Sequence, residues 1–77
     1  MNADRRKRLN EIGLHIASMK DDIQALLDEE QEAYDNMPES FQNGERGEKA
    51  QEVISTLEDA INHCDEIEGA LTGAGEA

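Results

Sequence analysis

Apolar residues recur at alternating intervals of three and four positions from residue 9 to residue 37. Positions spaced in this way share one side of an α-helix, so the pattern predicts an amphipathic helix over about residues 4–35. Leu27 widens this apolar side, and Asp4 is the expected N-cap. The stripe consists of Leu9, Ile12, Ile16, Met19, Ile23, Leu26, Glu30, Ala33 and Met37.

A second stripe with the same spacing predicts a helix over about residues 45–71. Glu45 and Glu48 fall in its first turn, where the helix dipole favours negative charge. Ile54 and Ile61 widen the stripe to one side, and we expect residues 73–77 to form a flexible tail. The stripe consists of Ala50, Val53, Leu57, Ala60, Cys64, Ile67 and Leu71.

The connector between the two predicted helices spans residues 36–44. Pro38 disfavours helical geometry at Met37 and suits the first position of a short helical turn, Pro38–Phe41. We expect Met37 and Phe41 to tuck under this loop and close the end of the core. Two long helices with a short connector pack antiparallel, so residues 1–72 are predicted to form one all-α, two-helix hairpin.

A lone two-helix hairpin buries little apolar surface relative to the chain entropy it must offset. Leu27, Ile54 and Ile61 have no evident cover in the seam of such a hairpin. We therefore expect self-association through these three residues, as a homodimer that forms a four-helix bundle or coiled coil, or as a higher assembly.

The charge of the chain is strongly negative and unevenly distributed. With 19 acidic and 7 basic residues the net charge is −12, yet residues 1–8 carry a local charge of +3. A body this acidic repels nucleic acid and anionic membranes and attracts basic protein surfaces, although such charge often serves solubility alone. The candidate partner-binding residues lie outside the stripes and are Asp21, Asp22, Asp28, Glu29, Glu32, Glu52, Glu58 and Asp59.

The basic cluster has two interpretations. Its residues are Arg5, Arg6, Lys7 and Arg8. In an antiparallel hairpin the cluster lies beside the end of the second helix, where it would form weak ion pairs with acidic residues. Alternatively, it is a basic tip that binds phosphate, but no aromatic residue is near to stack on bases, so direct nucleic-acid binding is not expected. The acidic residues concerned are Asp65, Glu66 and Glu68.

Glu30 is the one charged residue on the first stripe. A polar residue in a helical seam often fixes the register or the choice of partner at some cost in stability. Lys49, near the same end of the hairpin, is its candidate partner.

No catalytic or metal-binding pattern is present. Cys64 lies on the apolar stripe and is expected to be a small buried side chain, whereas His63 points about 100° away from it around the helix. His15 and His63 lack the spacing of a zinc site, and the acidic segment 28–35 lacks the turn of a calcium loop. We expect no enzyme activity, cofactor or metal.

The compartment expected from the sequence is the cytoplasm. A single cysteine excludes an internal disulfide framework and favours a reducing environment. The chain has no apolar run of about 18 residues, and no such run follows the basic cluster as it would in a secretory signal.

The segments 34–42 and 45–50 resemble a family of small, functionally uncharacterised, acidic helical-hairpin proteins of bacterial phages and mobile elements. That family combines an acidic helix, an Asn-x-Pro-Glu-x-x-Gln connector, a Ser-Glu-Arg helix start and a second acidic helix. The resemblance covers about the last two thirds of the chain, with Gly44 in place of Ser and Phe41 in place of Leu. It implies a source and a shape, and it favours an accessory role such as inhibition of host defences.

Together these features predict a non-enzymatic protein-binding module, in its finer form a phage-encoded acidic inhibitor. Its partner would be a host protein with a basic or nucleic-acid-binding surface. The alternative is a self-assembling structural or adaptor protein, whose acidity serves only solubility and which binds through apolar residues such as Leu14 or Tyr34. A small-ligand site between protomers around the arginines is a third option.

Overall fold

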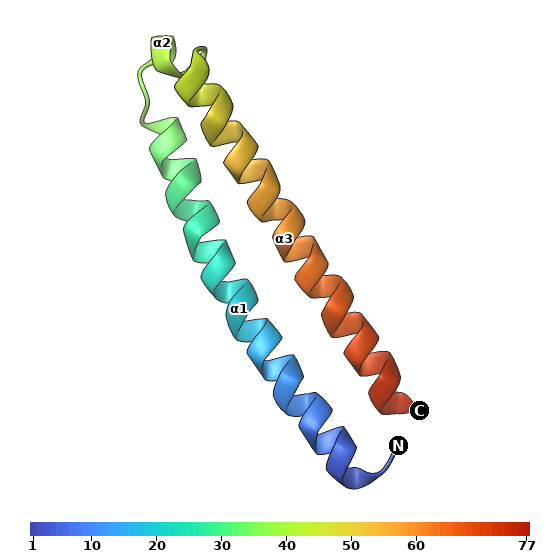
Figure 1. The fold of residues 1–77 in the computed structure, drawn as a ribbon. Coiled ribbons are helices and arrows are strands. Elements are labelled where there is room, and N and C mark those ends of the chain that lie inside the picture. Colours follow the sequence, from blue (N-terminus) through green and yellow to red (C-terminus); the bar gives the residue numbers. More distant parts are fainter.

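The structure, a computed structural model, describes all 77 residues and contains three helices and no strand. They are α1 (Ala3–Asp35), α2 (Glu39–Gln42) and α3 (Glu45–Glu76). Helices α1 and α3 run antiparallel and side by side, with α2 at the connector end and both termini at the other end (Figure 1). The molecule is a rod of 58 × 15 × 11 Å. The predicted all-helical hairpin is confirmed.

Helix α1 begins at Ala3, one residue before its predicted start, and its N-cap is Asn2 rather than Asp4. Asn2 has extended backbone geometry, and its side chain accepts a hydrogen bond of 2.8 Å from the backbone N–H of Arg5. This bond satisfies one of the free N–H groups of the first turn. The predicted N-cap Asp4 instead lies in the first turn and pairs with Arg8 at 3.6 Å.

Helix α3 ends at Glu76, so the helix stop predicted after Leu71 is wrong. Contacts from both helices support the extra turn. Thr72 Oγ1 donates to the carbonyl of Glu68 at 3.0 Å, and Arg6 Nε donates to the carbonyl of Gly75 at 3.1 Å. Because the last carbonyls of a helix lack partners of their own, the arginine offsets the weak helix propensity of the glycines.

The connector packs its backbone directly against α3. Gly47 is buried, and a Cβ atom built on it would overlap the carbonyl oxygen of Gln42 and lie 2.6 Å from that residue's Cα. The Gln42 side chain donates to the carbonyl of Tyr34 at 2.9 Å, which ties α2 to the end of α1. Met37 is partly buried as expected, whereas Phe41 is 45% exposed, with the Arg46 guanidinium 5.2 Å from its ring centroid.

The seam between α1 and α3 is formed by residues that are buried or half-buried at every turn of both helices. In α1 the seam residues are Leu9, Gly13, Ile16, Lys20, Ile23, Leu27, Glu30 and Tyr34. In α3 they are Gly47, Ala50, Ile54, Leu57, Ile61, Cys64, Glu68 and Leu71.

This seam corrects the assignment of Leu27, Ile54 and Ile61 to an uncovered surface. All three lie in the seam, and Ile54 is only 8% exposed. Each helix carries three neighbouring rows of residues that are mostly apolar, and one partner helix covers only two of them. The third row remains at the surface of the hairpin. This row contains residues that the predicted stripes place in the seam. Its large members are 43–56% exposed and are Ile12, Met19, Leu26, Val53 and Ile67.

Candidate functional site

The eight candidate partner-binding carboxylates are all exposed, and none of them forms an ion pair. Only Asp28 has a side-chain partner, the amide of Gln24 at 2.9 Å. The antiparallel arrangement brings segments 21–32 and 52–59 together between the middle of the rod and the connector (Figure 1). The structure therefore gathers these residues, from here on the carboxylate patch, onto one half of the molecule.

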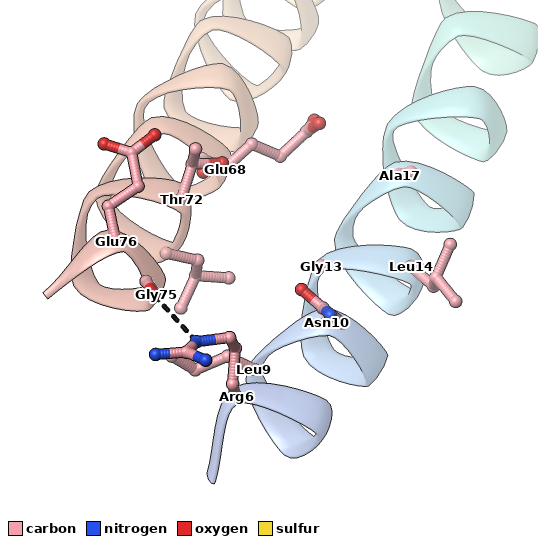
Figure 2. Close-up of a pocket in the computed structure, with 11 residues that line it drawn as sticks. Arg6, Leu9, Asn10, Gly13, Leu14, Ala17, Glu68, Thr72, Gly75 and Glu76 are labelled. Carbon is pink, nitrogen blue, oxygen red and sulfur yellow. Dashed lines mark hydrogen bonds between the residues drawn. The ribbon is translucent and has the colours of Figure 1, made fainter. Parts of the chain in front are cut away.

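The basic cluster does not pair with the acidic residues proposed for it. Arg6 donates instead to two backbone carbonyls, Gly75 at 3.1 Å and Met1 at 3.0 Å, and Figure 2 shows it reaching from α1 to the end of α3. The expectation of ion pairs with Asp65, Glu66 and Glu68 is wrong, because Arg6 lies opposite Gly75, well beyond them along α3. The cluster lies at the free end of the rod.

Lys20 pairs with two of those acidic residues and forms the only ion pairs between α1 and α3. Its Nζ lies 2.8 Å from Asp65 Oδ1 and 3.0 Å from Glu68 Oε1. Glu68 Oε1 is buried and lacks a partner at hydrogen-bonding angles, so proximity to the ammonium group is what compensates its charge. The hydrogen bond to Asp65, followed by the interaction with Glu68, raises the pKa of Lys20. The sequence pattern does not predict this link, because the predicted stripe places Met19 rather than Lys20 in the seam.

The raised pKa sets the pH range over which this link stabilises the fold. The contribution is fully present below the ordinary Lys pKa of 10.5 and disappears as the pH rises through the higher folded-state value. Arginine keeps its charge in that range, so a Lys20→Arg variant is the matched control. We expect the melting temperature of the wild type to fall more steeply than that of Lys20→Arg from pH 10 to 12. Parallel curves would show that the link adds nothing.

Glu30 and Lys49 do not form the proposed pair. Glu30 is half-buried in the seam without an ion pair, and Lys49 Nζ lies 3.6 Å from Glu45 on its own helix. Tyr34, a candidate partner contact, is half-buried, and its hydroxyl accepts a hydrogen bond of 2.8 Å from Gln51. Leu14, the other candidate, is 72% exposed.

The seam encloses the only thiol of the chain. Cys64 is 4% exposed, which confirms the predicted small buried side chain. His63 points to solvent, and its Nδ1 lies 3.7 Å from Glu66. No three His, Cys, Asp or Glu side chains lie close enough together to hold a metal ion, and neither long helix is apolar enough to cross a membrane.

A shallow groove runs along one side of the hairpin near the termini (Figure 2). Asn10 and Ala17 from α1 and Thr72 from α3 contribute to its lining. A Cβ atom on Gly13, which also lines it, would meet nothing within 4 Å, so this glycine does not serve a close approach of the helices. Leu14 points away from α3 in Figure 2.

A second groove shows that the two helices share one polar side. It is lined by Gln31 from α1 and by Gln51 and Glu58 from α3, and Lys20 meets Asp65 on this side. Each of these groove-lining residues directly follows a seam residue along the chain, as do the groove-lining Asn10, Ala17 and Thr72. Residues that directly precede Gly13, Lys20 and Leu27 in α1 therefore lie on the opposite side of the hairpin. The same holds in α3 for residues that directly precede Ile54, Ile61 and Glu68.

That opposite side is apolar along most of its length, and we call it the apolar face. The stripes predicted from the sequence place the larger residues of this face in the seam instead. The available signal was the third row of residues, in which four successive members at seven-residue spacing are apolar in each helix and only the first member, Arg5 or Arg46, is charged. The members are Ile12, Met19, Leu26 and Ala33 of α1, with Val53, Ala60, Ile67 and Ala74 of α3.

Comparison with known proteins gives no assignment, since no family model, curated protein or solved structure matches the chain.

Proposed function

We propose that this protein is a non-enzymatic module that binds another protein through the carboxylate patch. The observation that carries the proposal is that eight exposed carboxylates gather on one half of the rod without a cationic partner in the chain. Uncompensated charge of one sign attracts a surface of the opposite sign and accelerates association with it. The partner therefore carries a basic surface.

The spacing of the patch supports a finer proposal, an acidic inhibitor that occupies a nucleic-acid-binding surface. Asp21 and Asp28, Asp22 and Glu29, and Glu52 and Asp59 each lie seven residues apart. Two helical turns separate the members of each pair, so the carboxylates repeat about every 10 Å along the helices. Regular rows of negative charge imitate a phosphate backbone, and the resemblance to acidic phage proteins points in the same direction.

The test is a binding experiment with two variants of equal net charge. One neutralises the patch through Asp21→Asn, Asp22→Asn, Asp28→Asn and Glu29→Gln. The control neutralises four exposed carboxylates elsewhere and consists of Glu11→Gln, Glu39→Gln, Glu66→Gln and Glu76→Gln. Each protein is immobilised and exposed to host lysate at about 0.05 M and about 0.5 M salt, and retained proteins are identified by mass spectrometry.

We expect wild type and control to retain the same nucleic-acid-binding protein at low salt and to release it at high salt. The patch variant should retain at least about tenfold less, because four attractive charges are lost from the contact. Equal retention by the patch variant would contradict the proposal. Salt-insensitive recovery of the protein alone would favour the alternative, a self-assembling structural or adaptor protein.

A separate observation, the exposed apolar face, supports the alternative function of a self-assembling structural or adaptor protein. Five large apolar side chains on this face are 43–56% exposed in a chain that buries only four residues. Apolar patches of this kind mark interaction sites on small proteins. Self-association into a four-helix bundle is compatible with partner binding, because most of the carboxylate patch lies away from the apolar face.

A further inference from the structure

We propose that the apolar face is covered by a second copy of this chain with its long axis reversed. The two hairpins then form a four-helix bundle with α1 beside α1, α3 beside α3, and the connectors at opposite ends. This inference rests on the self-association proposed above and adds the interface, the orientation and the register.

The dimensions of the rod suit such a partner. Its broad side measures 58 by 15 Å, which offers roughly 900 Å² for contact. A standard protein interface buries about 800 Å² on each partner. A second hairpin of the same length covers the whole apolar face, and no shorter element does so.

The apolar face of α1 is complementary to its own reversed copy. When Met19 lies opposite Leu26 of the second copy, Ile12 lies opposite Ala33. The two-fold axis that relates the copies then passes at the centre of this pairing, between residues 22 and 23. A large residue then meets a small one, or two flexible chains meet, at each level. Alternation of large and small side chains lets two helices interdigitate without voids.

The apolar face of α3 fits the same operation. When Ile67 lies opposite Ala60 of the second copy, Val53 lies opposite Ala74, and the centre falls between residues 63 and 64. The contact of Lys20 with Asp65 places this centre within about one residue of the centre in α1. One two-fold axis therefore generates both pairings.

The charge distribution selects the reversed orientation. Residues 5–8 contain four basic residues, whereas residues 28–39 contain six acidic and no basic ones. In the reversed dimer, the basic end of each copy lies beside the acidic connector end of the other. With both connectors at the same end, the basic clusters of the two copies would share one end of the bundle and the acidic connector segments would share the other. The net charge of −12 opposes either dimer, so the local distribution decides between them.

The first measurement is the mass of the wild-type protein by sedimentation equilibrium, together with two variants of α1. Leu26→Glu places a charge on the apolar face, whereas the matched control Leu14→Glu changes the same residue type at a site that is 72% exposed on the other side. We expect a dimer for wild type and control, and a dissociation constant at least about 100-fold higher for Leu26→Glu, because each dimer would bury two unpaired carboxylates. Helicity by circular dichroism shows whether the variant folds.

The second measurement determines the orientation and does not depend on that variant. A spin label is attached at the exposed connector residue through Ser40→Cys in a Cys64→Ala background, and the distance between labels is measured by pulsed electron–electron double resonance. The reversed dimer predicts about 50 Å, whereas connectors at the same end predict about 20 Å. A short distance would overturn the orientation and leave self-association standing. A monomeric wild type would overturn both, without bearing on the carboxylate patch.

Discussion

Replacing Gly47 with alanine is expected to lower the free energy of unfolding by about 1–3 kcal/mol. Alanine normally favours a helix, so the sign of this effect depends on the connector. The added Cβ would overlap the backbone of Gln42, and a backbone group does not rotate away as a flexible side chain does. The connector must then lift from α3, which also strains the bond between the Gln42 side chain and Tyr34.

Gly69→Ala is the matched control for this prediction. It lies in the same helix, is exposed, and its added Cβ meets nothing within 4 Å. Helix propensity alone then predicts a gain of up to about 1 kcal/mol. Urea denaturation of the two variants at equal chain concentration measures both effects. Stabilisation by both substitutions would show that the connector does not rest on Gly47.

The sequence predicts the elements of this fold well because its apolar periodicity is long and is interrupted by one proline. The predicted start of α3 at Glu45 and the connector at residues 36–44 agree with the structure. The helix ends are predicted less well, since they depend on contacts between segments distant in the sequence. The bond from Arg6 to Gly75 joins residues 69 positions apart and has no local signature.

The seam could not be identified from periodicity, because two different pairs of rows satisfy the same three–four alternation. Both include Ile16 and Ile23, but one continues through Met19 and the other through Lys20. From the sequence alone, the row that contains Met19 is the expected seam row, because Met19 is apolar and Lys20 is charged. The structure places Lys20 in the seam, where it is half-buried and its ammonium group contacts Asp65 and Glu68.

The sequence alone predicts that the residues of the carboxylate patch are exposed. It does not predict which charged residues of the chain form ion pairs with one another. Placing acidic residues outside the apolar stripes is enough to predict that they face solvent. Ion pairs depend on the register between the helices, which the sequence does not show. The predicted pair of Glu30 and Lys49 fails for this reason, and Lys49 pairs within its own helix instead.

The second large effect on stability is expected at Ile54, because the structure places this residue in the seam. This residue is 8% exposed, whereas its neighbour Val53 is 44% exposed on the apolar face. Truncation of a buried isoleucine to alanine removes packed methyl groups and leaves a cavity, so Ile54→Ala is expected to cost about 2–4 kcal/mol of unfolding free energy. In the monomeric hairpin, Val53→Ala should cost less than about 1 kcal/mol, because the lost burial is partial and alanine is the better helix former.

The pair of substitutions distinguishes the two seams, because the stripe predicted from sequence buries Val53 and leaves Ile54 at its edge. Chemical denaturation at one chain concentration, low enough that the protein is monomeric, gives both free energies, and a two-state fit with equal slopes makes them comparable. A larger loss for Ile54→Ala supports the seam seen in the structure, and with it the apolar face on the opposite side of Lys20. A larger loss for Val53→Ala would move Val53 into the hairpin core and remove the surface on which the reversed dimer depends.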